Sequence, residues 1–334
     1  MSSMKEVAKL AGVSISTVSR VINNSVPVEE ETRKRVEKAI KKLNYKPNLL
    51  AKGLRIKSGR LIGLVVPGSV YNHAFASFID YIESNVSNKG YNLILGHNRN
   101  DPDSEAEFID MLIRRNVDGI ILSRVSDESR VLRMLGNNKI PVVVIDRAFS
   151  DESVPSVVLD NYRAGVLAAK HFIEERHKVI ACLTGPLNIS LCRDRMEGFR
   201  ETLKNHNIEF SEDDIYEGDF KYESGVDFVK KIMSKKKRYT AIWAQNDLMA
   251  IGIINHFLKN GYNIPKDISV VGMDDISFSS MMVPSLTTVG QPFSKMCKTA
   301  VDVIYDQIRG KNILKKRFVF QPYFVSRETT MRIG

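Results

Sequence analysis

Residues 3–24 read SMKEVAKLAGVSISTVSRVINN, and this stretch predicts two short helices joined by a tight turn. Ser3 followed by Glu6 is a capping-box pattern, in which a hydroxyl and a carboxylate satisfy backbone N–H groups at a helix start. The apolar positions of the first helix then recur at helical spacing: Val7, Ala8, Leu10 and Ala11. Gly12 interrupts the helix, so the stretch predicts a helix-turn-helix unit.

The second helix of this unit has a polar outer face. Ser14 can cap it, and its inward side is apolar: Val18, Val21 and Ile22. The positions left to point elsewhere are Ile15, Ser16, Ser19 and Arg20. Small hydrogen-bonding side chains with one arginine suit a helix that lies in the DNA major groove. Capped helix pairs also occur in ordinary bundles, and the pattern alone leaves that alternative open.

Positive charge is concentrated at the start of the chain. Residues 1–60 contain 14 lysines and arginines against five glutamates, a net charge of +9, whereas the whole 334-residue chain carries +10. A run of charge is usually a solvated face, but here nearly all of the excess lies in one small module. This distribution is typical of a surface that binds phosphates, and it favours nucleic acid as a partner.

Two segments, VAKLAGVSISTVSRVINN at 7–24 and KLNYKPNLLAKGL at 42–54, resemble the lactose-repressor (LacI/GalR) family of bacterial transcription regulators. The resemblance implies a three-helix DNA-binding domain over 1–47 and a hinge helix and linker over 48–60. It also implies an effector-binding and dimerisation domain over 61–334. Such a chain binds a pseudopalindromic operator in double-stranded DNA and is controlled by a small molecule.

The DNA-binding candidates divide by chemistry. We expect Ile15, Ser16 and Arg20 to meet base edges, because they occupy the outer face of the second helix. Phosphate contact or helix capping is expected of the others: Ser14, Thr17 and Asn23.

A third helix is predicted from about Glu29 to Leu43, after which Pro47 breaks the helical pattern. The short segment 48–54 that follows contains Gly53, so by itself it is a marginal helix or a flexible linker. By resemblance it is a hinge helix that forms only on the operator. Leu54 of two subunits would then wedge into the minor groove and kink the duplex.

From Leu61 onward, short apolar runs alternate with helical stretches. Strands are predicted at 61–66, 91–95, 119–122, 142–145, 157–159, 179–183, 241–244, 269–272 and 318–320. This order predicts an α/β fold of two doubly wound parallel-sheet halves, as in periplasmic binding proteins. We assign about 61–160 and 292–320 to an N-subdomain, and about 161–289 and 321–332 to a C-subdomain. Ligands of such folds bind beyond the carboxyl ends of strands, which predicts a cleft between the halves.

Candidate effector ligands follow several of these strands. They are Phe75, Asp146, Arg147, Arg195, Phe220, Asn246 and Asp274. Taken singly, an acid after a strand is as often a helix cap as a ligand, and a phenylalanine is more often part of a core. The resemblance implies that Arg195 and Asp274 clamp hydroxyls beside Asn246, while Phe220 stacks on the ligand ring. Asp146 and Arg147 are candidates to join this set.

Such contacts suit a sugar or a sugar derivative. Family members that bind purines carry an arginine and a threonine where this chain has Ile189 and Leu191, so a nucleobase is disfavoured. Catabolite-control members, whose effector is a phosphorylated carrier protein, lack an arginine at the position of Arg195. The segment 71–75, YNHAF, departs from the family pattern and leaves the identity of the sugar open.

Several classes of protein are disfavoured by what the sequence lacks. No run approaches the roughly 20 apolar residues of a membrane helix, and no signal segment precedes the first helix, which predicts a cytoplasmic protein. Three widely spaced cysteines are expected to be reduced, and no histidines stand at metal-ligand spacing, so neither a metal nor a cofactor is expected. The sequence has no nucleophile elbow and no phosphate-binding glycine loop, which argues against an enzyme.

One small basic module gives too little contact for tight specific binding, so a homodimer that reads two half-sites is expected. Helices after Phe75 and near 248–260 are candidate dimer surfaces. No leucine-heptad tail precedes Gly334, which favours a dimer over a tetramer. The alternatives are a catabolite-control-like regulator whose effector is a protein, and a sugar-binding protein without a regulatory role.

Overall fold

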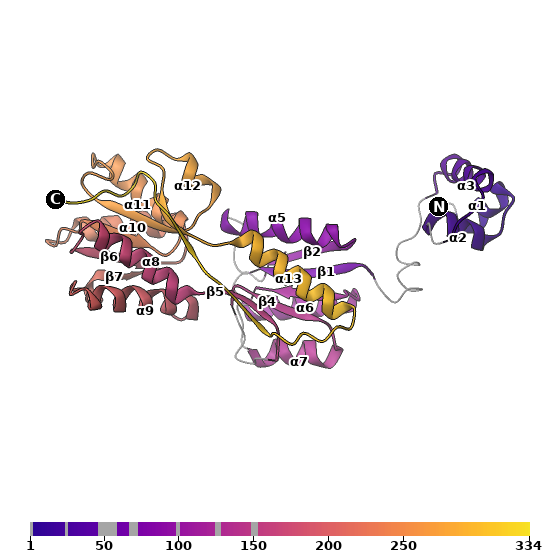
Figure 1. The fold of residues 1–334 in the computed structure, drawn as a ribbon, viewed down its shortest axis with the longest axis horizontal. Helices are drawn as coiled ribbons and strands as arrows, with labels where there is room; N and C mark the ends of the chain where they lie inside the picture. Colours follow the sequence, from indigo (N-terminus) through magenta and orange to yellow (C-terminus); the bar gives the residue numbers. More distant parts are fainter. Residues whose placement is uncertain are drawn as a thin grey trace. The chain divides into compact units, whose positions relative to one another are not determined.

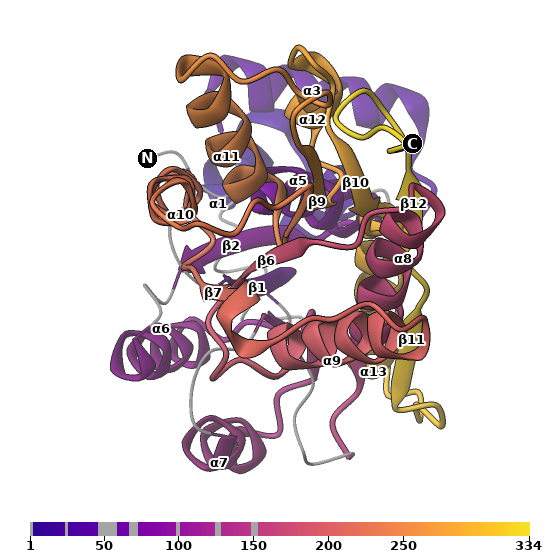
Figure 2. The same ribbon diagram turned by 90° about the vertical axis from the view of Figure 1, so that its left-hand side faces the viewer.

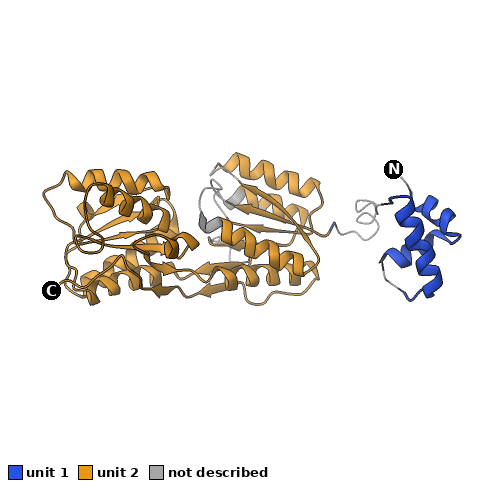
Figure 3. Ribbon diagram, turned by 90° about the horizontal axis from the view of Figure 1, so that it is seen from above, with its two compact units in different colours: residues 1–59 blue, residues 60–334 orange. Residues whose placement is uncertain are grey.

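The computed structural model describes residues 3–23, 26–45, 59–66, 73–97, 101–123, 128–147 and 153–334. The chain forms two compact units, residues 1–59 and residues 60–334, which Figure 3 shows in different colours. Each unit is described by itself. The segment 48–58, with the predicted hinge helix and Leu54, lies outside the described residues.

The described residues of the first unit form three helices: α1 (Met4–Ala11), α2 (Ile15–Asn23) and α3 (Glu30–Lys42). The predicted capping box is present, since Ser3 N donates to Glu6 Oε2 at 2.7 Å and Glu6 N donates to Ser3 Oγ at 3.3 Å. Gly12 ends α1 at φ 65°, in the left-handed region that glycine adopts most readily. The sequence therefore determines both ends of α1.

The core of this unit is small. Its buried residues are Val7, Ala8, Ala11, Val18, Val21, Val36, Ala39 and Tyr45. Leu10 was predicted to belong to the apolar face of α1, and this is wrong, because its side chain is 46% exposed. Positions 7, 8 and 11 form one stripe along the helix, and Leu10 falls beside that stripe.

The first half of the second unit is a six-stranded parallel sheet. Its order is β11 (Arg317–Phe320), β5 (Ser156–Leu159), β4 (Val142–Ile145), β3 (Gly119–Leu122), β1 (Leu61–Val66) and β2 (Asn92–His97). On one face, α5 (His73–Asn88) and α13 (Phe293–Ile308) pack side by side (Figure 1). The other face is covered by α6 (Pro102–Arg114) and α7 (Glu128–Asn138).

The second half repeats this architecture. Its sheet has the order β12 (Tyr323–Val325), β10 (Thr287–Gly290), β9 (Ser269–Asp274), β8 (Ala241–Ala244), β6 (Ile180–Thr184) and β7 (Ile215–Glu217), and only β12 is antiparallel to its neighbour. Figure 2 shows the paired helices α8 (Asn161–Glu174) and α9 (Ser190–Asn205) on one side of the sheet. The pair α10 (Tyr222–Met233) and α11 (Asp247–Lys259) packs on the other, and a short helix α12 (Ser277–Met281) follows β9.

The chain crosses between the two halves at three places. It passes from β5 to α8, from β10 to α13, and from β11 to β12. Figure 1 shows these crossing segments between the two sheets. The predicted fold class is confirmed: a helix-turn-helix unit precedes two doubly wound halves with the connectivity of a periplasmic binding protein.

Candidate functional site

The outer face of α2 is available to a partner. Ile15 is 48% exposed, and Ser16 and Arg20 are also exposed. Ser14 caps the helix: its Oγ accepts from Thr17 N at 3.1 Å and lies 2.8 Å from Thr17 Oγ1. Asn23 is the last residue of α2. Ile15, Ser16 and Arg20 are therefore accessible on α2 and Ser14 is its N-cap, while the side chain of Asn23 is outside what the structure describes.

Exposed cations lie on all three described helices of this unit. The exposed ones are Lys5, Lys9, Arg20, Lys34, Arg35, Lys38, Lys41 and Lys42. Lys34 stands 4.0 Å from Glu30, a solvent-exposed pair that neutralises little of the charge. The unit therefore presents mostly unneutralised positive charge to solvent.

In the second unit, Arg195 is almost fully buried at 3% exposure. Its Nε donates to Asn161 Oδ1 at 2.8 Å, and its Nη1 donates to the backbone oxygen of Gln245 at 3.0 Å. These bonds use two of the five guanidinium N–H groups. Helices α8 and α9 can approach this closely because a Cβ on Gly165 would lie only 1.9 Å from the backbone oxygen of Arg195. Two hydrogen bonds thus hold Arg195, and its bonds to described residues leave further N–H groups for a ligand.

Asp274 ends β9, with 7% of its surface exposed. Its Oδ1 accepts from Gln291 Nε2 at 2.7 Å. Burial raises the pKa of Asp274 to about 8, and the positive charge of Arg195 opposes that rise. At neutral pH the carboxyl group is largely protonated and can donate as well as accept hydrogen bonds.

Asp146 and Arg147 follow β4 in the first half. Arg147 Nε stands 3.9 Å from Asp146 Oδ2 and is a buried donor with no hydrogen-bond partner among the described residues. Burial raises the pKa of Asp146, while the charges of Arg147 and Arg195 lower it. In turn Asp146 helps to raise the pKa of Asp274. Charged residues of both halves therefore lie within electrostatic reach of one another.

Three of these candidates have left-handed backbone conformations. Asp146 has φ 73°, Phe220 has φ 66° and Asp274 has φ 118°. Non-glycine residues rarely adopt such angles, and they cluster at functional sites where the surrounding structure holds them. Strain at the ends of three segments that supply candidate ligands supports a binding role.

Phe220 and Asn246 form one local structure. The Phe220 ring covers Gly185, where a Cβ would lie 2.1 Å from Phe220 Cζ. Asn246 Nδ2 donates to the backbone oxygen of Phe220 at 2.8 Å, and its Oδ1 accepts from Met249 N at 2.9 Å as the N-cap of α11. Asn246 thus uses both ends of its amide within the protein. Phe75 lies in the first turn of α5, and its side chain is outside what the structure describes.

The sequence analysis did not identify three residues whose polar groups bond Arg195 or Asp274: Asn161, Gln245 and Gln291. Gln291 is 6% exposed, and its Oε1 is buried with no hydrogen-bond partner among the described residues. A buried amide oxygen without a partner is costly, and a bound ligand with a donor would relieve that cost. The sequence offered a signal for Gln245, which directly follows the predicted strand 241–244, but none for Gln291, which follows β10, a strand that apolar patterning does not predict.

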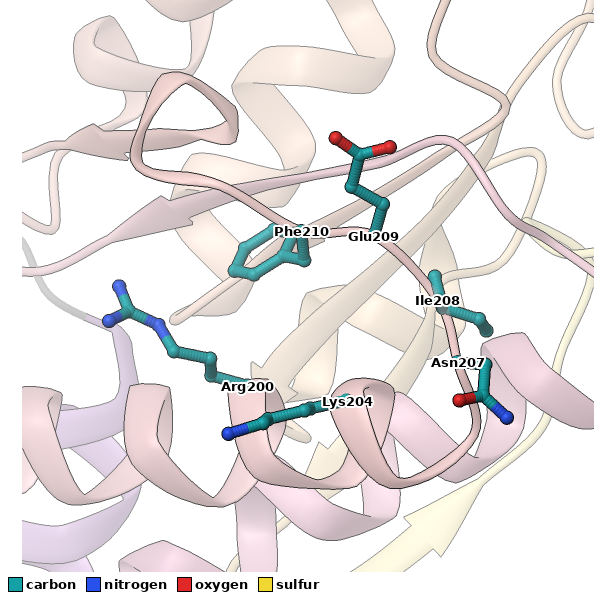
Figure 4. Close-up of a pocket in the computed structure, with 6 residues that line it drawn as sticks. All are labelled: Arg200, Lys204, Asn207, Ile208, Glu209 and Phe210. Atoms are coloured by element: carbon teal, nitrogen blue, oxygen red, sulfur yellow. The ribbon is translucent and has the colours of Figure 1, made fainter.

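Other features of the described residues do not compete with this site. An open hollow near the end of α9 is lined by Arg200, Lys204, Asn207, Ile208, Glu209 and Phe210 (Figure 4). Its polar lining is solvent-exposed or paired, as Arg200 is with Glu212 at 2.6 Å. In the described part of the chain, no group of three or more histidine, cysteine or acidic residues could hold a metal ion. No helix there has the length and apolarity to cross a bilayer.

Comparison with protein families gives two matches that together span most of the chain. Residues 3–48 match the bacterial regulatory proteins of the lacI family, and residues 60–326 match the periplasmic binding proteins and sugar-binding domain of the LacI family. A PurR transcriptional repressor of Aliivibrio salmonicida is 34% identical over all of both chains, and that of Vibrio vulnificus is 36% identical over all of both chains.

Solved structures agree. The Lac repressor dimer bound to operator and the anti-inducer ONPF has a TM-score of 0.88 at 29% identity, covering 99% of each chain. A complex of the regulator CelR with cellobiose has a TM-score of 0.75 at 29% identity, covering 98% of this chain and 100% of that chain. A LacI-family regulator of Enterococcus faecium with bound ribose has a TM-score of 0.74 at 26% identity, covering 82% of this chain and 100% of that chain. The chain therefore belongs to the LacI family of bacterial regulatory proteins, which are DNA-binding transcription regulators and not enzymes.

Proposed function

We propose that this chain is a cytoplasmic repressor that binds a pseudopalindromic operator as a homodimer and responds to a sugar or sugar derivative. Residues 1–47 read the operator, 48–60 form the hinge, and 61–334 bind the effector and dimerise. The observation that carries the effector site is a group of polar residues within electrostatic reach of one another, in which Arg195 and Asp274 are buried. Two atoms of this group, Arg147 Nε and Gln291 Oε1, are buried with no hydrogen-bond partner among the described residues.

Operator contact is assigned to the exposed face of α2. Arg20, Ser16 and Ile15 meet base edges, while Ser14, Thr17 and Asn23 cap the helix or contact phosphates. The unneutralised cations of this unit supply the salt-dependent part of the binding free energy. Leu54 is assigned the minor-groove wedge of the hinge.

The effector contacts are assigned to Arg195 and Asp274 as the hydroxyl clamp, with Phe220 as the aromatic platform. Asp146 and Arg147 contact the ligand from the first half, and Asn246 holds the Phe220 loop beside it. Phe75 is proposed as a further contact on the ground of the sequence resemblance alone, since its side chain lies outside what the structure describes. Arginine N–H donors together with carboxyl groups that can donate or accept suit a ligand rich in hydroxyl groups. Solved relatives bound to cellobiose and ribose support this class.

A purine is the competing effector, because PurR repressors bind purines. The residues before Arg195 argue against it here. Leu191 is buried, and Ile189 occupies the N-cap position of α9 without a side-chain hydrogen bond. Neither side chain can bond the polar edge of a base, whereas a sugar does not need them.

We assign the contact with the second subunit of the homodimer to the apolar surface at α12 and the turn that follows it. Phe278 is 49% exposed, Met281 70% and Val283 87%. Contiguous exposed apolar side chains of this size mark protein–protein surfaces. Leu258 on α11 and Tyr81 on α5 add partly exposed apolar area on the two helices that sequence reasoning favoured for the dimer.

A thermal-shift screen of the full chain against sugars, sugar phosphates and purines tests the effector class. We expect a free sugar to raise the unfolding temperature, and Arg195→Lys to abolish the shift while the neighbouring exposed Arg193→Lys retains it. A shift with purines alone would replace the sugar by a nucleobase. No shift with any compound, together with operator binding that responds to a phosphorylated carrier protein, would favour the catabolite-control alternative.

A further inference from the structure

Arg195 and Asp274, the two proposed clamp residues, each form a hydrogen bond with an amide side chain on a segment that crosses between the two halves. Arg195 Nε donates to Asn161 Oδ1 at 2.8 Å, and Gln291 Nε2 donates to Asp274 Oδ1 at 2.7 Å. Asn161 stands where β5 of the first half leads into α8 of the second. Gln291 stands where β10 of the second half leads into α13 of the first. Each clamp is therefore bonded to a crossing segment.

Asn161 has contacts in both halves. While its Oδ1 accepts from Arg195, its Nδ2 donates to the backbone oxygen of Leu159, the last residue of β5, at 3.3 Å. Asn161 is 7% exposed and Arg195 3%, so water cannot readily replace these bonds. A displacement of the Arg195 guanidinium group must therefore either break its hydrogen bond to Asn161 or move the Asn161 amide group, which is bonded to Leu159 at the end of β5.

Gln291 connects Asp274 to α13 in a similar way. Its side chain bonds Asp274, while its backbone oxygen accepts from Phe293 N at 2.8 Å at the start of α13. Its Oε1 has no partner among the described residues, so the hydrogen bond that holds the Gln291 side chain there is the one to Asp274. The position of the Gln291 amide thus depends on Asp274.

The third crossing segment is bonded to the first. Gln321, between β11 and β12, donates from Nε2 to Asp160 Oδ2 at 3.1 Å. Asp160 N donates to the backbone oxygen of Phe320 at 2.8 Å. Asp160, the residue before Asn161, therefore bonds the segment between β11 and β12.

We propose that Asn161 and Gln291 are positioning residues that couple the state of the effector clamp to the crossing segments. This inference rests on the proposed effector site and names the contacts through which a ligand there alters the relation of the two halves. Energetic coupling between sites is reciprocal. Loss of a clamp side chain must therefore loosen the crossing segments even when no ligand and no DNA are present.

Hydrogen exchange of the ligand-free full chain tests the first connection. In Arg195→Ala, the amide of Asp160 should exchange about tenfold faster, because the loss of a buried charged hydrogen bond weakens the segment locally. Arg193→Ala is the matched control. It removes an arginine of the same helix whose Nη1 bonds the backbone oxygen of Leu187 rather than the Asn161 amide, and should leave this exchange unchanged.

A double-mutant cycle separates coupling from general destabilisation. Asn161→Asp keeps an acceptor for Arg195 but removes the donor to Leu159. In the Asn161→Asp background, Arg195→Ala should raise the exchange rate of the Asp160 amide by less than about twofold, because the hydrogen bond from Asn161 to Leu159 is already lost. The proposal is overturned if Arg195→Ala raises the exchange rate by the same factor in the Asn161→Asp background as in the parent. It is also overturned if Arg195→Ala alone leaves the exchange rate of the Asp160 amide unchanged. If the alanine variant does not fold, Arg195→Lys replaces it, since lysine keeps the charge and lacks the Nε–H group.

The same cycle applies to Asp274→Ala and Gln291→Leu, with exchange read at the amide of Phe293. Gln321→Leu is the control, because Gln321 lies on a crossing segment and bonds Asp160 and neither clamp. No sugar or operator enters these measurements. Failure to find an effector would therefore not affect the exchange measurements. Additive effects in the two cycles would overturn the coupling through Asn161 and Gln291 without affecting the proposed function.

Discussion

Asn246 donates from Nδ2 to the backbone oxygen of Phe220 at 2.8 Å while its Oδ1 caps α11. One amide therefore fixes the start of a helix and the loop that carries the aromatic candidate. Asn246 is 2% exposed, so the loss of either bond leaves a buried polar group without a partner.

Asn246→Ala is expected to lower the free energy of unfolding by about 1–3 kcal/mol, because it removes an N-cap and a buried hydrogen bond. Urea unfolding of the full chain measures the change. Asn260→Ala, at the exposed end of the same helix, should stay within about 0.5 kcal/mol of the parent. Equal losses in the two variants would show that Asn246 has no special role.

Asp274 gives the stability of the second unit a distinct pH dependence. Its folded-state pKa of about 8 lies above the value near 3.9 expected in the unfolded chain. The folded state therefore retains a proton that the unfolded state releases, and this group lowers stability progressively as pH rises from about 4 to about 8. Asp274→Asn cannot ionise, so its stability relative to the parent should rise over that range.

Urea unfolding of parent and variant at pH 5, 7 and 8.5 measures this difference. Asp227→Asn serves as the control. Asp227 is an exposed carboxylate paired with Lys230 at 2.8 Å, which lowers its pKa, so its variant should show no trend across these pH values. The assigned pKa would be contradicted if the difference in the free energy of unfolding between the parent and Asp274→Asn stays constant with pH.

Arg20→Ala should weaken operator binding by about 1–3 kcal/mol and relax the preference at one base position in each half-site. The operator is first selected from random pseudopalindromic duplexes and then titrated at fixed salt. Lys38→Ala on α3 should cost less and affect all sequences alike, as expected for a phosphate contact. Unchanged affinity and preference in Arg20→Ala would remove this residue from base reading.

Met281→Asp combined with Val283→Asp should dissociate the homodimer, because it places charges on the apolar surface at α12. Sedimentation velocity measures the species present. Leu314→Asp is the matched control, since Leu314 is 87% exposed and lies in the loop before β11. A dimer that persists in the double variant would place the contact elsewhere.

Apolar patterning predicted most of the sheet, because its central strands are uninterrupted runs such as Ile120–Leu122 and Val142–Ile145. It missed β7, β10 and β12, and in β10 both Thr287 and Thr288 are fully buried. Thr288 Oγ1 bonds Asp247 at 2.6 Å, and Thr287 N bonds Thr329 Oγ1 at 2.8 Å. These partners are distant in sequence, so the burial of such polar residues could not be predicted locally.

The candidate site shows a similar limit. Positions after strands identified Asp146, Asn246 and Asp274, because carboxyl ends of parallel strands meet at one edge. Position alone could not separate a helix cap from a ligand, and Asn246 proves to be a cap. Nor could it identify Asn161, whose bond to Arg195 spans 34 positions and depends on the close packing of α8 and α9.

The central claim is that a basic helix-turn-helix unit binds DNA under the control of a small molecule in the second unit. Fluorescence anisotropy of the full chain on its selected duplex, with and without the sugar that gives the largest thermal shift, tests it most directly. We predict binding that weakens steeply with salt and an affinity that changes about 5- to 150-fold with the sugar. Failure to bind any pseudopalindromic duplex at low ionic strength, in either state, would contradict the account.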